Sequence, residues 1–233
     1  MKRFIRNTLG AAADLLFPPR CVHCSAPGSL FCDRCVTDSP QLGEVTGCRR
    51  CALPAPGDIC DACYTNPPPL DLALAVFAYD SPIRDAVTAF KYNDIRALAP
   101  VLAGFMNERL PERVKRGIDV VVPIPMAANR LRSRGYNQAE LLARRLCDAA
   151  DLDLATGLLA RTNTAEPQAR ANNLEQRAEN VKDAFTVTAS TANLRILLID
   201  DVMTTGSTLN SCARTLKTAG ASWVGALVLA REL

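Results

Sequence analysis

Apolar residues beyond position 70 fall into short runs that alternate with stretches of helical periodicity. The runs predict strands, each uncharged in its middle, at 72–79, 119–124, 184–188, 195–199 and 223–229. The periodic stretches predict helices at 83–92, 97–109, 137–150 and 207–219, the last followed by Gly220 in the position of a helix-terminating glycine. Uncharged strands that alternate with helices are typical of a sheet covered on both faces, so the pattern predicts an α/β fold with a central, mostly parallel sheet.

The region before residue 70 follows neither pattern and holds most of the cysteines. Eight of the ten lie between Cys21 and Cys63, and three consecutive prolines, 67–69, come after them. Such prolines stiffen a linker and fit inside neither a helix nor a sheet. We therefore expect two parts: residues 1–66, a short amphipathic helix with a cysteine module, and residues 67–233, the α/β domain.

The cysteines of this module occur as four C-x2-C pairs. The pairs are Cys21 and Cys24, Cys32 and Cys35, Cys48 and Cys51, and Cys60 and Cys63. Two such pairs supply the tetrahedral four-sulfur site that structural zinc prefers, with no position left for a substrate. Disulfides, a redox pair and ordinary buried thiols are the alternatives, and none of them explains four copies. The spacing predicts one or two structural zinc ions and does not separate sequential from crossed pairing; we favour two sequential ribbons.

Composition limits the compartment and the partners. No apolar stretch approaches the roughly 18 residues that a membrane helix requires, so no membrane span is expected. A basic opening precedes apolar residues as in a signal peptide, but Asp14 interrupts them and Pro18 and Pro19 follow, which favours an amphipathic helix. Without a signal peptide, thiols at this spacing favour a cytoplasmic protein with bound metal. The 27 basic and 24 acidic residues, net +3, favour a nucleic-acid partner only through a local basic surface.

The segment 195–208 combines a buried strand, two acids and a hydroxyl-rich turn. The strand delivers Asp200 and Asp201 to its carboxyl end, where open α/β sheets keep their ligands. The turn consists of Thr204, Thr205, Gly206, Ser207 and Thr208. It opens a helix, where backbone N–H and side-chain O–H groups can surround a phosphate. Because the acids suit a ribose diol and a magnesium ion, the whole segment fits one sugar phosphate.

Two other interpretations of this segment are weaker. Asp and Thr can simply cap a helix, but capping explains one residue and not the whole run. The acids also resemble the end of the magnesium-binding strand of a nucleotide triphosphatase, but the chain has no G-x-x-x-x-G-K-[ST] segment and no G-x-G-x-x-G segment. A phosphoribosyl pyrophosphate site is therefore the interpretation we favour.

The run from Asp200 to Thr208 resembles the phosphoribosyl-pyrophosphate motif of type I phosphoribosyltransferases. Together with the cysteine pairs and the segments 123–125, 130–138 and 177–181, it makes nearly the whole chain similar to the ComF family, also called GntX. The resemblance implies a type I phosphoribosyltransferase-like fold behind a double zinc ribbon, and a link to competence and DNA uptake. It also implies that Asp200 and Asp201, as the catalytic pair, hold the ribose hydroxyls and magnesium, while Thr204 to Thr208 hold the 5-phosphate. The turn after the strand 119–124 would face the pyrophosphate.

Three arginines, Arg130, Arg132 and Arg134, follow the strand 119–124 on the same rim as the turn from Thr204 to Thr208, which we call the phosphate loop. Their guanidiniums suit pyrophosphate or a nucleic-acid backbone, and we assign Arg130 and Arg134 to the bound ligand. A solvated basic loop is the alternative. Residues 161–180 form a polar connection too long for a simple turn, which is typical of a mobile lid.

Two functions from different classes fit these features. In the first, the protein binds phosphoribosyl pyrophosphate and magnesium and acts in DNA uptake, with single-stranded DNA and DNA-uptake proteins as partners. In the second, it is an active magnesium-dependent phosphoribosyltransferase on an unidentified acceptor in nucleotide metabolism. The zinc ribbons and the arginine run favour the first. Against it, few aromatic residues near basic ones are available to stack on bases: Phe90, Tyr92 and Tyr136.

Overall fold

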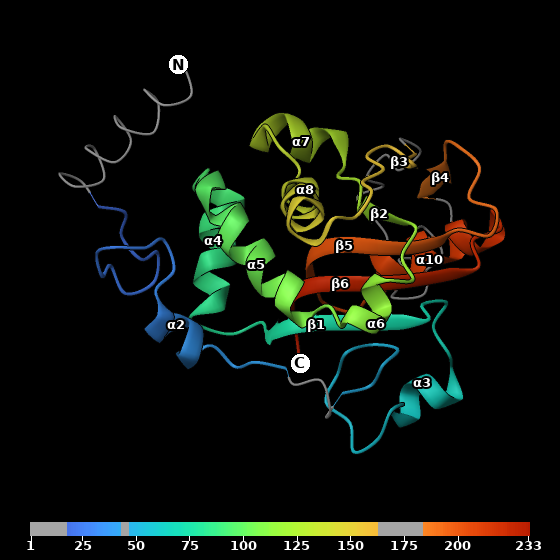
Figure 1. Ribbon diagram of the computed structural model, residues 1–233, viewed down its shortest axis with the longest axis horizontal. Coiled ribbons are helices and arrows are strands. Elements are labelled where there is room, and N and C mark those ends of the chain that lie inside the picture. The colour runs from blue at the N-terminus through green and yellow to red at the C-terminus, as the bar shows by residue number, and fades with distance from the viewer. Residues whose placement is uncertain (1–17, 43–46, 163–183) are drawn as a thin grey trace, which may run out of the picture.

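The computed structural model describes residues 18–42, 47–162 and 184–233, and four parallel strands form its central sheet (Figure 1). The strands are β1 (Leu72–Ala78), β2 (Val120–Pro123), β5 (Arg195–Met203) and β6 (Trp223–Arg231), in the order β1-β6-β5-β2. The prediction of a central parallel sheet is therefore confirmed. The amphipathic helix predicted near the start and most of the lid predicted at 161–180 lie outside the described residues.

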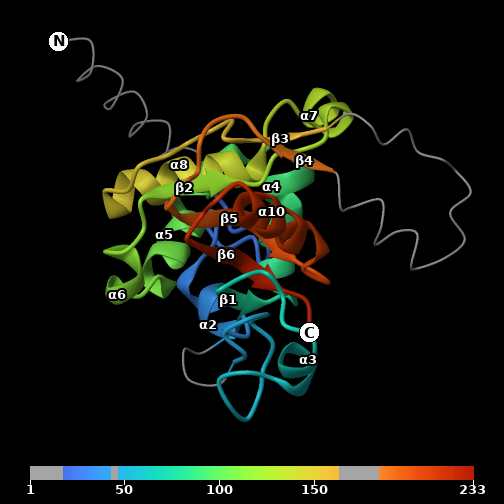
Figure 2. The ribbon, with the colours of Figure 1, turned by 90° about the vertical axis from the view of Figure 1, so that its right-hand side faces the viewer.

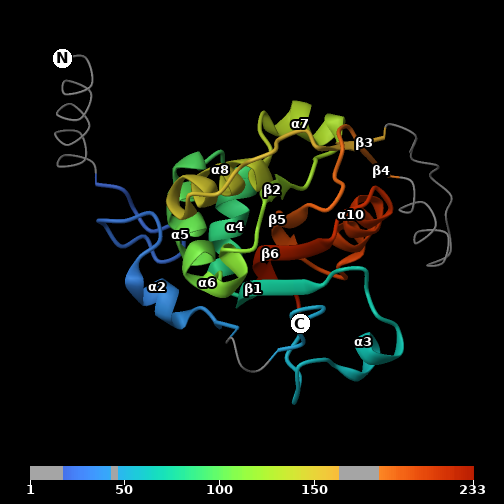
Figure 3. The ribbon, with the colours of Figure 1, turned by 45° about the vertical axis from the view of Figure 1, so that its right-hand side comes forward.

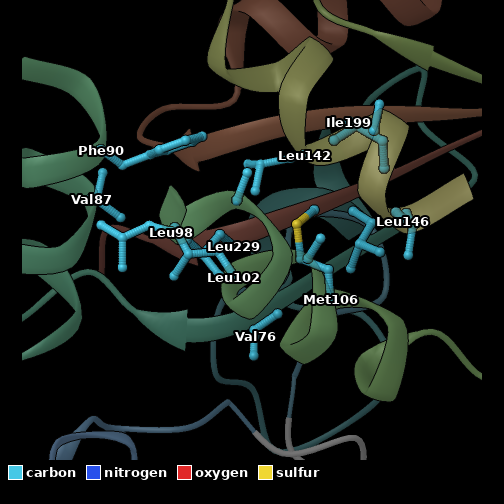
Figure 4. Close-up of a cluster of buried hydrophobic side chains, with 14 of the residues drawn as sticks. Val76, Val87, Phe90, Leu98, Leu102, Met106, Leu142, Leu146, Ile199 and Leu229 are labelled. Atoms are coloured by element: carbon cyan, nitrogen blue, oxygen red, sulfur yellow. The ribbon is translucent and has the colours of Figure 1, made fainter. Parts of the chain in front are cut away.

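Helices cover both faces of this sheet (Figure 2). They are α4 (Ile83–Tyr92), α5 (Ala99–Arg109) and α8 (Gln138–Ala150) on one face and α10 (Ser207–Thr218) on the other. Leu197 and Ile199 of β5 belong to the first layer of the core, whereas Ile196 and Leu198 pack with α10. Figure 4 shows the first layer, in which Ile199 and Leu229 lie near Leu102, Met106, Leu142 and Leu146. Because successive side chains of a strand point to opposite faces, one apolar run fills both layers.

One predicted strand lies outside the central sheet. The run at 184–188 forms β4 (Phe185–Val187), but β4 pairs antiparallel with β3 (Leu159–Arg161) in a separate two-stranded sheet. Phe185 is buried and Thr186 is exposed, which is the alternation of a strand with one solvated face. Its placement in the central sheet is therefore a wrong prediction, since the run lacks the continuous apolar character of a doubly covered strand.

The helix boundaries differ from the predictions in detail. The helix predicted at 97–109 begins as a 3-10 turn, η1 (Arg96–Leu98), before α5. Two short helices, α6 (Glu112–Lys115) and α7 (Ala128–Arg134), lie outside the predicted ones. Gly220 has a φ of +96°, which confirms it as the residue that ends α10. Within the described parts of the chain, no helix is both long and apolar enough to cross a membrane.

The cysteine module lies along β1 (Figure 3). Its helices are α2 (Asp33–Asp38) and α3 (Asp61–Thr65). The Leu42 N–H donates to the Val76 carbonyl at 2.9 Å, and the Ala73 N–H donates to the Arg49 carbonyl at 2.7 Å. Phe31 is buried in the same core cluster as α4 and α5. The module thus covers the open edge of the sheet and extends its core.

Candidate active site and metal centres

The two acids lie at the carboxyl end of β5, inside the strand rather than after it. The predicted strand ends at residue 199, but β5 continues to Met203 and pairs Asp200 with Val228 of β6. Asp201 is buried and Asp200 is half-buried. Because neighbours in a strand point to opposite faces, Asp201 lies on the face of α4 and Asp200 on the face of α10. The strand therefore separates two carboxylates that are adjacent in the sequence.

Lys91, in the last turn of α4, contacts Asp201, and the sequence pattern does not predict it. Its Nζ lies 2.7 Å from Oδ1 of Asp201, and the two side chains are 17% and 11% exposed. A pair with so little exposure is only weakly screened by salt. Lysine is common in the last turn of a helix because it interacts favourably with the helix dipole, so nothing in the sequence distinguishes Lys91 from a solvated residue. The fold places its ammonium group at the ligand edge of the sheet.

Asp200 has an unusually basic carboxylate. Burial raises the pKa of Asp200 to about 7, and the neighbouring charge of Asp201 adds to the rise. A hydrogen bond from the Asp201 N–H to Oδ1 of Asp200, 2.9 Å long, and the charge of Lys91 act in the opposite direction. A carboxyl with a pKa in this range is half-protonated near neutrality, and a bound cation would displace its proton. The charge of Asp200 therefore depends on what is bound beside it.

The turn from Thr204 to Thr208 leads into α10, and the first N–H of the helix, that of Ser207, donates to Oγ1 of Thr205 at 3.3 Å. Gly206 occupies the N-cap position with a φ of +77°, and a Cβ there would meet Cε of Met203 at 2.5 Å. The Thr205 hydroxyl donates to Oγ of Ser207 at 3.1 Å, and the residues Thr204, Thr205 and Ser207 are exposed. The start of a 12-residue helix therefore presents N–H groups beside three exposed hydroxyls, an arrangement that suits a phosphate.

The three arginines predicted as a rim of the site lie on a helix, α7, rather than on a loop. An Arg134 terminal nitrogen donates to Oε1 of Gln138 at 2.7 Å, and its guanidinium lies 4.9 Å from the centre of the Tyr92 ring. Arg130 and Arg132 are exposed. Arg134 is thus fixed by its neighbours, whereas Arg130 and Arg132 are open to an anionic partner.

The aromatic residues near these arginines divide into buried and exposed ones. Phe90 and Tyr136 are buried, and the Tyr136 hydroxyl donates to the Phe90 carbonyl. The guanidinium of Arg96 lies 4.4 Å from the centre of the Tyr136 ring. Tyr92 is 71% exposed. Of the three aromatic residues considered for base stacking, Tyr92 is the one that offers its ring to solvent.

The eight paired cysteines form two separate clusters. The first cluster is Cys21, Cys24, Cys32 and Cys35, and the second is Cys48, Cys51, Cys60 and Cys63. In each cluster the four Sγ atoms lie within 4.8 Å of one another, with 3.6 Å between Cys21 and Cys35. With Zn–S bonds of about 2.3 Å, the edge of a regular tetrahedron measures about 3.8 Å. The donors and their spacing fit one zinc ion in each cluster, in the sequential pairing that we favoured.

Backbone hydrogen bonds favour a thiolate in each cluster. Burial acts to raise the pKa of Cys21, but N–H groups that include those of Cys24 and Cys32 outweigh it and lower the pKa to about 6. At Cys48, burial is likewise outweighed by N–H groups of the second cluster, and the pKa falls to about 7. Zinc binds the thiolate and not the thiol. One thiol of each cluster is therefore deprotonated most readily, whereas burial raises the pKa of Cys35, Cys51 and Cys63 while no metal is bound.

A cavity of about 710 Å³ lies at the other end of the sheet from the two acids. It is lined by residues at the amino ends of β1, β5 and β6, among them Leu72, Arg195 and Trp223, and by Arg49 of the cysteine module. None of the residues 200–208 lines this cavity. The candidate ligand site at the carboxyl end of β5 is therefore separate from this cavity.

Two family models and several named proteins match this chain. The phosphoribosyl transferase domain model matches residues 91–233, and the double zinc ribbon domain model matches residues 12–65. The DNA utilization protein YhgH of Salmonella typhi is 31% identical, over 94% of this chain and 100% of that protein. Competence protein F of Haemophilus influenzae is 28% identical, over 91% and 96% of the two chains. A solved purine phosphoribosyltransferase from Pyrococcus horikoshii Ot3 is 15% identical with a TM-score of 0.36, over 57% of this chain and 80% of that chain.

Proposed function

Since the chain belongs to the ComF family, with a double zinc ribbon ahead of a phosphoribosyltransferase-like domain, we propose that it binds phosphoribosyl pyrophosphate with magnesium at the carboxyl end of β5. One observation carries the proposal: Asp200, Asp201 and the start of α10 belong to a single strand-turn-helix unit. The acids suit a sugar diol, and the helix start suits a phosphate. A ribose 5-phosphate carries both groups on one small molecule.

The roles of the residues follow from their chemistry. Thr204 to Thr208 bind the 5-phosphate through N–H and hydroxyl groups. Asp200 and Asp201 bind the ribose hydroxyls and the magnesium ion, because magnesium prefers oxygen ligands. When bound, magnesium supplies positive charge that stabilises pyrophosphate as it leaves the sugar. Arg130 and Arg134 bind the pyrophosphate, Arg134 as the fixed donor and Arg130 as the exposed one.

Lys91 gives the two acids different roles in this proposal. It neutralises Asp201, whereas no lysine or arginine of the described residues lies within ion-pair distance of Asp200. The metal therefore binds chiefly at Asp200, where it replaces a proton. Since burial raises the pKa of Asp200 to about 7, binding strengthens as the pH rises through that value.

Isothermal titration calorimetry with magnesium and phosphoribosyl pyrophosphate tests this site. We expect heat of binding with the wild type and none with the double variant Asp200→Asn, Asp201→Asn. Asp148→Asn, an exposed acid on α8, is the control for loss of charge and should bind as the wild type does. Absence of heat with the wild type at every magnesium concentration would refute the proposal, as would equal binding by the double variant.

A second candidate function is binding of single-stranded DNA along α7, in a role in DNA uptake. Arg130 and Arg132 are exposed, and the exposed Tyr92 contacts the guanidinium of Arg134, the last residue of the same helix. Guanidiniums that follow a phosphate backbone and an aromatic face that stacks on bases are the two parts of a single-strand site. The names of the relatives, for DNA utilization and competence, support this function, with DNA-uptake proteins as further partners.

Salt-dependent binding of an oligonucleotide tests the DNA site. Changing both Arg130 and Arg132 to Gln should weaken binding and reduce the slope of log affinity against log salt by about 1.4, at about 0.7 per phosphate contact. Tyr92→Leu should weaken binding without a change in slope. Arg113→Gln, an exposed arginine on α6, is the control. If the wild type does not bind at low salt, this function is excluded.

The alternative of an active phosphoribosyltransferase on an unidentified acceptor rests on the same site. Release of pyrophosphate that depends on magnesium, and is lost with Asp200→Asn and Asp201→Asn, would favour it. Binding without release would favour a protein that uses phosphoribosyl pyrophosphate as a bound regulator. In either case the eight clustered thiols favour action in the reducing cytoplasm.

A further inference from the structure

Arg231 ends β6 as a buried guanidinium, only 5% exposed. A buried charge is tolerated only when its polar atoms find partners. Nε donates to the Cys51 carbonyl at 3.0 Å. Nη1 donates to the Met203 carbonyl at 3.1 Å and to the Thr204 carbonyl. One side chain therefore joins the second cysteine cluster to the first residues of the phosphate loop.

At the cysteine end, the acceptor belongs to the turn that holds the metal. The N–H groups of Cys51 and Ala52 donate to the Cys48 carbonyl at 3.3 and 2.7 Å, and Ala52 has a φ of +59°. The Cys51 carbonyl is thus oriented by the same turn that orients the Cys48 and Cys51 thiolates. Four thiolates around one zinc ion carry a net charge of about −2, which favours a cation such as Arg231 nearby.

At the loop end, the acceptors fix the point where β5 becomes the phosphate loop. The Glu232 N–H also donates to the Met203 carbonyl, at 3.0 Å. The Met203 side chain lies under Gly206, close enough that a Cβ on Gly206 would meet it. Arg231 therefore holds the backbone at 203–204 while the Met203 side chain supports the turn that follows.

The first cysteine cluster makes a different set of contacts. His23 Nδ1 lies 2.7 Å from Oδ2 of Asp85 in the first turn of α4, and Phe31 joins the core. Among the residues that the structure describes, no hydrogen bond connects the segment 18–42 with the segment 200–208. The chain thus contains two similar clusters, of which the second contacts the loop through Arg231.

We propose that the second zinc cluster positions the phosphate loop through Arg231, a positioning residue, so that zinc in this cluster and the phosphate ligand favour one another. The identity of that ligand rests on the proposed function, whereas the coupling between cluster and loop does not. Loss of the metal-binding turn should therefore loosen the phosphate loop and weaken binding of the ligand. Because coupling between two sites is reciprocal, the bound ligand should in turn favour zinc in this cluster.

Matched cysteine variants of the full-length zinc protein test the coupling. Cys60 and Cys32 are the third cysteines of their clusters, both are half-buried, and each precedes a short helix as its N-cap. We compare Cys60→Ser, Cys32→Ser and Arg231→Lys with the wild type. Lysine keeps the positive charge but has a single donor nitrogen, so it cannot reach both sets of carbonyls. Hydrogen exchange of residues 202–210, followed by mass spectrometry, measures how readily the backbone of the phosphate loop opens when no ligand is present.

Faster exchange at 202–210 is expected in Cys60→Ser and Arg231→Lys and not in Cys32→Ser, with exchange at 196–199 unchanged in all three. Affinity for magnesium phosphoribosyl pyrophosphate should fall about tenfold in the first two variants, as loss of one charged hydrogen bond predicts. Equal exchange in Cys60→Ser and Cys32→Ser, or wild-type exchange in Arg231→Lys, would overturn the coupling. If the wild type binds no phosphoribosyl pyrophosphate, the proposed function fails while the exchange comparison still decides the coupling.

Discussion

Loss of the ion pair between Lys91 and Asp201 should destabilise the protein more than loss of any ordinary surface pair. Lys91→Met keeps most of the apolar stem and removes the ammonium group that lies 2.7 Å from Oδ1 of Asp201. Breaking a buried pair costs about 3–5 kcal/mol, because the remaining charge is left without a partner. Since the two side chains are still 17% and 11% exposed, we expect Lys91→Met to lower the free energy of unfolding by about 3 kcal/mol, the lower end of this range.

Asp201→Asn removes the other partner and should cost less. The flexible stem of Lys91 lets its ammonium reach water, so the loss is closer to that of one hydrogen bond, about 1 kcal/mol. The double variant Lys91→Met, Asp201→Asn leaves no charge buried. We therefore expect its free energy of unfolding to fall by about 2 kcal/mol, instead of the sum of about 4 kcal/mol for the two single changes. The difference is a coupling free energy of about 2 kcal/mol.

Urea unfolding measures these values, and the single tryptophan of the chain, Trp223, reports on the sheet because it begins β6. Lys115→Met is the control, since Lys115 pairs at 3.3 Å with Glu112, whose side chain is 68% exposed. That change should cost less than about 1 kcal/mol. Strict additivity of the two single changes, or a loss from Lys91→Met no larger than the control, would show that solvent screens the Lys91 pair.

Three further predictions concern the acids, the loop and the metal. Affinity for magnesium phosphoribosyl pyrophosphate should rise between about pH 6 and pH 8, because Asp200, whose pKa burial raises to about 7, loses its proton there. Calorimetry should find a smaller rise in Asp200→Asn, where only the phosphate of the ligand, with a second pKa of about 6, still titrates. Gly206→Ala should lower the free energy of unfolding in urea by about 1–2 kcal/mol, because the φ of Gly206 is +77° and a Cβ would meet Met203. Gly104→Ala in α5 is the control: space is open at its Cβ, so this change should be neutral or slightly stabilising. Removal of zinc by a chelator should make residues 18–66 sensitive to protease before the sheet becomes sensitive, because so short a cysteine-rich segment folds only with its metal. Unchanged protease resistance of that segment would contradict this prediction.

The apolar runs predicted the sheet well because its strands are buried on both faces and therefore lack charge. The same criterion explains the two errors. It included the run 184–188, whose short antiparallel pairing with β3 produces an apolar signal of similar length. The criterion of uncharged runs also placed the end of a predicted strand at Ile199, because a charged residue normally marks the end of a buried run. β5 continues past that point since Lys91 neutralises Asp201 and the backbone stays paired with β6.

The candidate site was predictable only where it is local in sequence. The acids and the hydroxyl turn are contiguous, so their chemistry can be read from one segment of strand, turn and helix. The partners that define their charge and position come from elsewhere in the chain. Lys91 belongs to another helix, and Arg231 bonds to a cysteine 180 residues away. Such contacts depend on the packing of α4 and of the cysteine module against the sheet, which no local pattern encodes.

In the proposed function, the charges around β5 also bear on how the site would take up an anionic ligand. Two bare carboxylates would repel phosphoribosyl pyrophosphate. Lys91 cancels the charge of Asp201, and the raised pKa of Asp200 lets a proton cancel part of the other charge near neutrality. The site is then close to neutral before the ligand arrives, and magnesium carried by the pyrophosphate can take the place of the proton. This order favours joint binding of metal and ligand, so magnesium alone should bind far more weakly than magnesium with phosphoribosyl pyrophosphate.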